Sequence, residues 1–233
     1  MDPVFSVVIP AYNEERGIGA TIRETDGYFR GLGKPYEILV VDDGSRDRTA
    51  LEVERLFPEF PYLGLARHTA NQGKGAAVRT GVGAAVGEWT LFLDADLATH
   101  PTQFDRFLPH LETSDIVIGS RRVEGARIAI PQPWYRDLAG QGFNAAVRVY
   151  LGLPYRDTQC GFKAFHARTK PLFADLASSG WAFDVEILRR ARHLGLRIAE
   201  CPVVWRHQPE SRVRIHDAFA IAAELRRIRR ATR

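Results

Sequence analysis

The chain has 233 residues, of which 45% are hydrophobic and 26% are charged, and its formal net charge is +4. This composition excludes a disordered or fibrous chain and fits one α/β domain, or at most two small ones. The two cysteines, Cys160 and Cys201, have no metal-ligand spacing, and we expect reduced thiols in a cytoplasmic protein rather than a disulfide-stabilised scaffold.

Short apolar runs alternate with helical patterns along the first half of the chain. Strands are predicted at Phe5–Ile9, Glu37–Val41, Tyr62–Ala66, Trp89–Leu93 and Asp115–Ile118. Helices are predicted between them at Glu14–Leu32, Asp47–Phe57, Lys74–Val86 and Thr102–Leu111. This alternation, with strands that are apolar throughout, favours an α/β fold whose mostly parallel sheet is covered by helices on both faces.

The second half of the chain is less regular. Arg122–Pro133 contains a glycine and two prolines without a clear period, and it is predicted to be a loop. Further helices are predicted at Trp134–Leu151, Asp184–Leu194 and Arg214–Arg230. Further strands are predicted at Phe162–His166 and Ile198–Val204.

The sequence also indicates how the protein would meet a membrane. Its first residues lack the basic start and the small-residue cleavage site of a signal peptide. No apolar run approaches the roughly 20 residues that span a bilayer. If the protein acts on membranes, we therefore expect it to act from the surface, peripherally at the cytoplasmic face.

Acidic and polar residues follow four of the predicted strands, at the points where these strands end. The clusters are Pro10–Glu15, Asp42–Ser45, Asp94–Asp96 and Gly119–Arg121. In open α/β sheets, ligands bind beyond the carboxyl ends of the strands. If the sheet is parallel, all four clusters lie on one rim and form a ligand site.

Asp94 and Asp96 are the most chemically specific pair on this rim. Two residues apart in extended chain, their carboxylates project to the same side and repel each other. A hard divalent cation, Mg²⁺ or Mn²⁺, relieves the repulsion because it prefers oxygen ligands and is often shared with substrate phosphates. Solvated acids that cap a strand are the alternative, and the place of the pair on the rim favours the metal.

Two further motifs on the rim have both a ligand-binding and a structural interpretation. Asp42 and Asp43 can hold a base, a ribose hydroxyl or the second coordination shell, and Asp-Gly-Ser also forms turns well. Asn71–Gly75 precedes a helix, where glycines permit close backbone approach and Lys74 can meet a phosphate. The run matches neither a Walker A loop nor a dinucleotide fingerprint, and a plain helix start is its alternative.

Together these motifs resemble the family-two inverting glycosyltransferases, which have the GT-A fold. The runs that carry the resemblance are Val8–Glu15, Val41–Asp47, Asn71–Gly75 and Asp94–Asp96. In the second half, Gly119–Arg121, Asp157–Lys163 and Trp181–Glu186 resemble the polyprenyl-phosphate glycosyltransferases. The last two of these runs look most like the dolichyl-phosphate β-glucosyltransferase branch. The resemblance covers nearly the whole chain.

The resemblance implies a single GT-A domain over residues 1–233. Residues 1–120 would bind the nucleotide sugar, residues 121–213 the acceptor, and residues 214–233 would form a basic amphipathic helix. The implied reaction moves glucose from UDP-glucose to a polyprenyl phosphate with inversion, and it uses a divalent cation. Mannosyl-transferring relatives often carry Gln at the position of Ala98, so this alanine disfavours the mannosyl-transferring branch.

The resemblance also implies roles for individual residues. The residues expected to contact the nucleotide are Pro10, Tyr12, Glu14, Asp42 and Lys74, and Asp43 would lie beside them. Asp94 and Asp96 would serve the metal and the diphosphate, and Arg121 would hold phosphate groups. Asp157 stands where the family places its catalytic carboxylate, although it also suits a turn before Thr158. Trp181 and Asp184 would shape the sugar and acceptor pocket.

Arginines in the second half suit an anionic acceptor. Arg127 lies in the predicted loop, where a lid could close over substrate. The last predicted helix places apolar residues on one face, namely Ile215, Phe219, Ala222, Leu225 and Ile228. It either lies on an anionic membrane surface or packs on the domain or a second copy, so membrane binding and homo-oligomer formation both stay open.

Several alternative functions remain at this point. GDP-mannose can replace UDP-glucose as donor, or a soluble sugar can replace the lipid as acceptor. A nucleotide-sugar-binding regulator without activity is a third possibility. A nucleic-acid-binding module is disfavoured, because the basic excess is small and the distinctive residues are acidic.

Overall fold

The computed structural model describes residues 2–131, 133–178, 180, 182–207 and 218–231. Its centre is a seven-stranded sheet with the order β3-β2-β1-β4-β7-β5-β8. The strands are β1 (Phe5–Ala11), β2 (Tyr36–Asp42), β3 (Leu63–Arg67), β4 (Trp89–Leu93), β5 (Ile116–Ser120), β7 (Phe162–His166) and β8 (Ile198–Pro202). Only β7, among these seven, runs antiparallel to its neighbours, so the predicted mostly parallel sheet is confirmed.

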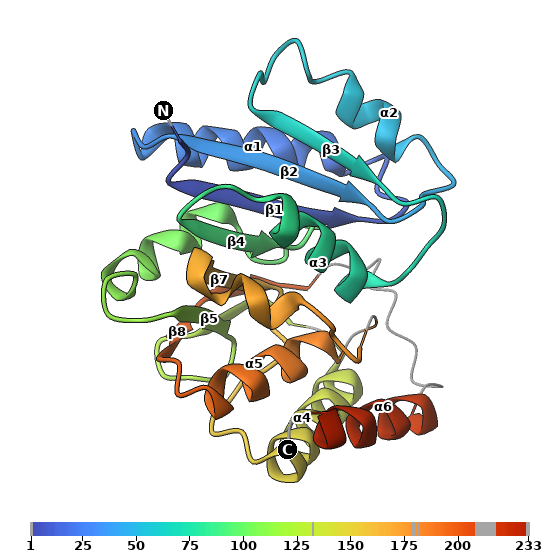
Figure 1. Ribbon diagram of the computed structural model, residues 1–233, viewed down its shortest axis with the longest axis vertical. Helices are drawn as coiled ribbons and strands as arrows, with labels where there is room; N and C mark the ends of the chain where they lie inside the picture. Colours follow the sequence, from blue (N-terminus) through green and yellow to red (C-terminus); the bar gives the residue numbers. More distant parts are fainter. Residues whose placement is uncertain (1, 132, 179, 181, 208–217, 232–233) are drawn as a thin grey trace.

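Helices lie on both faces of the sheet (Figure 1). The α-helices are α1 (Ile18–Gly31), α2 (Thr49–Glu54), α3 (Lys74–Ala84), α4 (Trp134–Leu151), α5 (Phe183–His193) and α6 (Ala218–Ala231). Short 3₁₀ helices are η1 (Pro101–Arg106), η2 (Leu108–His110) and η3 (Ala167–Phe173). None of the described helices is both long and apolar enough to cross a bilayer.

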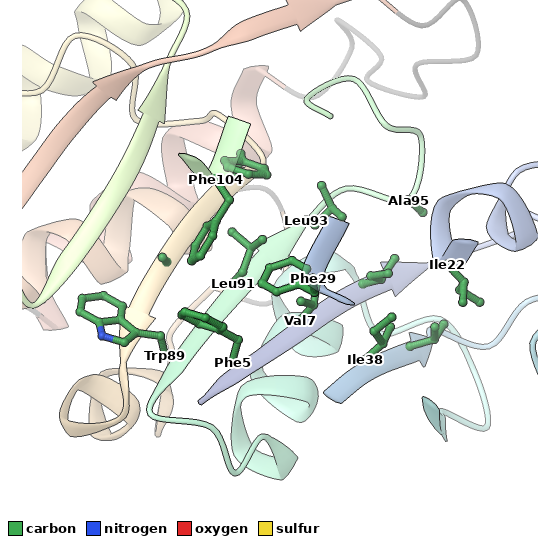
Figure 2. Packing of buried hydrophobic residues seen from close by; sticks show 14 of the residues in the cluster. Phe5, Val7, Ile22, Phe29, Ile38, Trp89, Leu91, Leu93, Ala95 and Phe104 are labelled. Atoms are coloured by element: carbon green, nitrogen blue, oxygen red, sulfur yellow. The ribbon is translucent and has the colours of Figure 1, made fainter. Parts of the chain in front are cut away.

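Alternation along β1 determines which helices cover which face. Phe5 and Val7 pack against Phe29 of α1 and Phe104 of η1, as Figure 2 shows, and the Phe5 and Phe104 rings lie 5.3 Å apart. Val8 points to the opposite face and packs against α3. Successive side chains of a strand point to opposite faces, so a continuous apolar run such as that of β1 requires cover on both sides.

Several predicted elements differ from the structure in type or extent, two helices among them. The predicted helix Thr102–Leu111 is a pair of 3₁₀ helices, because Pro109 has no N–H and its ring clashes with a preceding carbonyl. Helix α1 begins at Ile18 rather than Glu14, because a turn comes first: the N–H groups of Gly17 and Ile18 both donate to the Glu14 carbonyl.

The predicted loop Arg122–Pro133 contains a strand, β6 (Arg127–Ile130). It pairs in parallel with β9 (Val204–Arg206) in a separate two-stranded sheet. The predicted strand Ile198–Val204 is accordingly divided, with β8 in the main sheet and β9 outside it. Such short strands depend on long-range pairing that local sequence does not specify.

The C-terminal helix α6 packs on the domain over its described part. Leu225 and the fully buried Ile228 join a core cluster that includes Val147 and Leu151 of α4. Ile215 and the side chains of Phe219 and Ala222 lie outside the described part of the chain. Of the two alternatives for this helix, Leu225 and Ile228 therefore support packing on the domain.

Candidate active site

The four clusters predicted to share a rim do so. β1, β2, β4 and β5 all run in the same direction, so their carboxyl ends face one side of the sheet. The end of β1 lies directly beside the end of β2, with Ala11 opposite Asp42 and Pro10 opposite Val41. The sequence predicted that these four clusters share one edge of the sheet, and the structure confirms it.

The loops after β1 and β2 are fastened to each other. Asn13, in the left-handed region with φ 52°, accepts a hydrogen bond from the Arg46 N–H at 2.8 Å. Its own N–H donates to Ser45 Oγ, and the Glu14 N–H donates to Thr49 Oγ1 at 2.7 Å. These bonds hold the half-buried Tyr12 and Glu14 at the rim, next to Asp42.

Asp43 is a structural carboxylate that holds the Asn71–Gly75 turn. Its two oxygens accept the N–H groups of Gln72 and Gly73 at 2.9 and 2.8 Å. The His68 ring nitrogen Nδ1 lies 2.7 Å from the same carboxylate. Gly73 has a φ of 95°, a conformation that suits glycine, and α3 begins directly after it with Lys74.

Asp42 is as buried as Asp43 but less completely engaged. Its Oδ1 accepts the Ser45 N–H at 2.9 Å, which forms the expected turn. Its Oδ2 is buried and lacks a hydrogen-bond partner within the described residues, with Arg67 Nε 3.5 Å away. Buried polar atoms are nearly always hydrogen-bonded, so this oxygen suits a donor supplied by a ligand.

Lys74 and Asp94 form the centre of the rim. Lys74 Nζ lies 2.5 Å from Asp94 Oδ1 and 5.0 Å from the centroid of the Phe92 ring. Burial alone would lower the pKa of Lys74, but the carboxylates of Asp94 and Asp184 outweigh it and raise that pKa. Lys74 is therefore a charged ammonium at neutral pH, next to the end of β4.

Contacts with the core and with α1 hold the Asp94-Ala95-Asp96 turn in place. The Ala95 side chain lies in the core (Figure 2), and its carbonyl accepts a hydrogen bond from Thr21 of α1 at 2.6 Å. A Cβ atom on Gly161 would lie 1.8 Å from Asp94 Oδ2. The Asp94 carboxylate therefore occupies space that exists only because residue 161 is glycine.

The donor set of Asp94 and Asp96 fits a hard divalent cation. Burial first, and then repulsion by the Asp94 carboxylate, raise the pKa of Asp96, and a bound cation would relieve both effects. The described residues contain no cluster of three or more His, Cys, Asp or Glu side chains suited to a metal. Mg²⁺ is usually bound by one or two carboxylates together with substrate phosphates and water. Asp94 and Asp96 would supply two carboxylates and leave the other coordination positions to substrate and water.

Arg121, at the end of β5, forms a two-point ion pair with Asp157. Its Nε and terminal nitrogen lie 2.6 and 2.9 Å from the two carboxylate oxygens, and its backbone N–H donates to Asp157 at 3.0 Å. Glu200 of β8 accepts the Asp157 N–H at 2.8 Å and holds this loop from the other side. The Trp205 ring lies 5.3 Å from Arg121 Cζ, in cation–π contact.

This pairing determines the charge state of Asp157. Burial alone would raise the pKa of the carboxyl group, but the Arg121 charge and its hydrogen bonds outweigh burial and lower it. Asp157 is therefore an ionised carboxylate at neutral pH, with both oxygens engaged by Arg121. In this arrangement it orients a guanidinium rather than offering a free oxygen to a proton.

The comparisons with known proteins agree with this geometry. Residues 6–169 match the family described as "Glycosyl transferase family 2". The chain belongs to this glycosyltransferase family. Among similar proteins is a dolichyl-phosphate β-glucosyltransferase of Trichomonas vaginalis, 36% identical over 94% of this chain and 68% of that protein. The Saccharomyces cerevisiae enzyme of the same name is 32% identical over 97% of this chain and 74% of its own length.

Solved structures support the fold of this glycosyltransferase. Glucosyl-3-phosphoglycerate synthase from Mycobacterium tuberculosis in complex with UDP superposes with a TM-score of 0.68 at 22% identity. The match covers 97% of this chain and 80% of that one. The predicted GT-A fold and the predicted resemblance to the dolichyl-phosphate β-glucosyltransferase branch are confirmed.

Three of the predicted site residues are buried, belong to another element or lie outside the described structure. Asp184 is buried on α5, with Oδ1 2.7 Å from Lys163 Nζ, and it is near enough to Lys74 to raise the pKa of that lysine, so it supports the rim from within the core. Arg127 is exposed, but it begins strand β6 rather than belonging to a loop, because β6 pairs with β9. Trp181 lies outside the described residues.

Several residues of this glycosyltransferase site have contacts that the sequence did not predict. Lys163 is almost fully buried in β7, and besides Asp184 it contacts the Cys160 carbonyl at 2.5 Å. A lysine within the otherwise apolar run Phe162–Phe165 was the available signal, because a buried lysine requires a partner. Glu200 and Trp205 gave no comparable signal, because their contacts depend on how β8 and β9 are placed.

Proposed function

We propose that this chain is an inverting glucosyltransferase that moves glucose from UDP-glucose to a polyprenyl phosphate of the dolichyl type, giving a β-linked product. One observation carries the proposal: two cations, Lys74 and Arg121, and two carboxylates, Asp94 and Asp96, converge on one rim of a GT-A sheet. The donor sugar and the acceptor class come from the relatives, which are named for this reaction.

The fixed positive charges match the main catalytic task. As the glycosidic bond breaks, negative charge develops on the departing nucleoside diphosphate, and preorganised cations stabilise it. Asp94 holds Lys74 in place, so this cation needs little reorganisation when the charge appears, and Arg121, held by Asp157, adds fixed positive charge on the acceptor side. Asp42, Tyr12 and Glu14 lie where the nucleoside would meet the ends of β1 and β2, and Asp42 Oδ2 is the acceptor for the base or ribose.

Asp94 and Asp96 are the proposed ligands of a divalent cation, Mg²⁺ or Mn²⁺. When bound, such an ion supplies Lewis-acid stabilisation of the diphosphate. A further structure of the Mycobacterium tuberculosis synthase contains Mn²⁺ together with UDP and its glucosylated product. Gly161 leaves room for the Asp94 carboxylate, the Ala98 N–H donates to the Asp96 carboxylate, and Lys74 adds positive charge beside Asp94.

The state of Asp157 favours a phosphate acceptor over a sugar hydroxyl. A hydroxyl must lose a proton during attack and needs a general base, whereas a phosphate monoester is already ionised near neutral pH. Both oxygens of Asp157 are engaged by Arg121, so its proposed role is to hold the guanidinium that meets the lipid phosphate. The enzyme would carry out this reaction peripherally, at the cytoplasmic face of a membrane.

A panel of donors and acceptors tests this proposal. The purified protein is incubated with Mn²⁺ or Mg²⁺, a nucleotide sugar and a short polyprenyl phosphate in detergent, and nucleoside diphosphate release is measured with and without the lipid. Lipid-dependent release from UDP-glucose alone is expected. Release from GDP-mannose instead would overturn the donor, and release that needs a soluble sugar would overturn the acceptor.

A further inference from the structure

Helix α4 carries apolar residues on two opposite faces. Val147 and Leu151 are buried in the core cluster shared with α5 and α6. On the opposite face, Trp134 is 77% exposed, Leu138 63% and Val149 85%. At 100° per residue these three positions and the exposed Ala145 fall on one line along the helix, which we call the α4 apolar stripe.

Such a stripe is not what a helix at a protein–water boundary requires. A surface helix normally carries polar residues opposite its core-facing side, and an all-round apolar helix is normally covered. Single exposed apolar residues need no explanation, but here four of them share one side of an 18-residue helix. Ile130, at the end of β6 and a few residues before α4 in the sequence, is also 51% exposed.

Basic side chains lie on the helix next to α4. Helix α6 lies beside α4 at the end of the molecule farthest from β3 (Figure 1), and Arg229 Cζ stacks over the Tyr150 ring at 4.7 Å. Because Leu225 and Ile228 of α6 face the core, its arginines are turned outward: Arg226, Arg227, Arg229 and Arg230 are all exposed. Exposed apolar side chains on one helix and outward arginines on the helix beside it match the acyl chains and the phosphates of an anionic bilayer surface.

The same helix is joined to the proposed acceptor site. Asn144 of α4 donates to the Arg156 carbonyl at 2.6 Å and accepts a hydrogen bond from Thr158 Oγ1 at 3.0 Å. These two residues flank Asp157, which holds Arg121. A surface that binds α4 therefore lies next to the loop on which the proposed phosphate-binding arginine depends.

We propose that the α4 apolar stripe, with the exposed arginines of α6, is the surface by which the protein docks on an anionic lipid bilayer. Trp134 suits the interfacial depth that tryptophans prefer. A second copy of the chain fits less well, because a two-fold axis through the stripe would bring the arginines of α6 near their own copies. The link to an acceptor rests on the proposed function, whereas the docking itself needs no acceptor.

Vesicle sedimentation without polyprenyl phosphate tests the surface alone. Phosphatidylcholine vesicles are compared with and without phosphatidylglycerol, using the full chain, the double variant Trp134→Ser/Leu138→Ser and the control Val86→Ser/Leu194→Ser, whose residues are 63% and 68% exposed elsewhere. We expect the stripe variant to bind anionic vesicles at least about tenfold more weakly and the control to bind normally. Arg226→Gln/Arg227→Gln is expected to remove most of the advantage of phosphatidylglycerol.

Two further measurements separate the alternatives. Light scattering reports the oligomeric state: a dimer that the stripe variant dissociates, with vesicle binding unchanged, would overturn the proposal in favour of a second copy. Equal vesicle binding by all variants would also overturn it. Transfer to a short acceptor in detergent should be the same for the stripe variant and the wild type; if the wild type binds vesicles but transfers nothing, the docking surface stands and the proposed function fails.

Discussion

At the scale of single residues, the site depends on the absence of a side chain at Gly161 and on the ion pair between Arg121 and Asp157. Gly161 leaves room for the Asp94 carboxylate, and Arg121 holds Asp157 by two parallel contacts. Both features join the end of one strand to a loop more than thirty residues away. The rim carboxylates were predictable because they follow apolar runs directly, whereas Lys163, Glu200 and Trp205 were not, because their partners are set by long-range pairing.

Gly161→Ala tests the space around Asp94. The new Cβ would lie 1.8 Å from Asp94 Oδ2, so the carboxylate must move, and we expect Mn²⁺-dependent UDP binding to weaken at least about tenfold. Isothermal titration calorimetry measures this. Gly83→Ala on α3, which meets no heavy atom within 4 Å, is the matched control and should bind UDP normally. Equal UDP binding by both variants would mean that the space at Gly161 is not needed for Asp94 to support UDP binding.

Asp157→Asn tests the ion pair with Arg121. The amide keeps the shape of the side chain but loses the charge that orients the guanidinium, so we expect kcat to fall on the order of 100-fold while UDP affinity is kept. Steady-state kinetics and UDP titration separate the two quantities, and a melting curve confirms folding. Near-normal kcat would exclude Asp157 from the reaction.

At the scale of elements, long apolar runs were predictable and short paired segments were not. Trp89–Leu93, Trp134–Leu151 and Phe162–His166 have the predicted bounds, because local burial patterns define them. The strands β6 and β9 have four and three residues, and a strand pair this small is stable only on a supporting fold. The antiparallel insertion of β7 between β4 and β5 was likewise not expected.

Ile228→Ala tests whether α6 belongs to the folded domain. Ile228 is fully buried against α4 and α5, so its truncation should lower the free energy of unfolding by about 2–5 kcal/mol. Chemical denaturation measures the loss. Val86→Ala, at a site 63% exposed, is the control and should change stability little. An unchanged midpoint for Ile228→Ala would mean that α6 does not contribute to the core.

At the scale of the whole molecule, buried carboxylates connect stability to pH. Burial tends to raise the pKa of Asp115, but hydrogen bonds from Arg197 and the charge of Arg168 outweigh it and lower that pKa, as Arg121 does for Asp157. A depressed carboxylate pKa gives stability that is complete above the unfolded value, about 4, and is lost as the pH falls through the folded value.

Asp115→Asn should therefore lower the free energy of unfolding at neutral pH and make it less dependent on pH below about 4. Denaturation with urea at a series of pH values measures both effects. Glu124→Gln, which removes an exposed carboxylate, is the control and should leave the pH profile unchanged. A profile for Asp115→Asn that parallels the wild type would contradict this account of Asp115.

The central claim, transfer of glucose from UDP-glucose to a lipid phosphate, is tested most directly by following the sugar. The protein is incubated with UDP-[¹⁴C]glucose, Mn²⁺ and a polyprenyl phosphate, and the label is partitioned between water and organic solvent. We predict that the label enters the organic phase only when the lipid phosphate is present, and that Asp94→Asn abolishes the transfer. Label that stays in the aqueous phase, released as free glucose at the same rate without the lipid, would contradict the account.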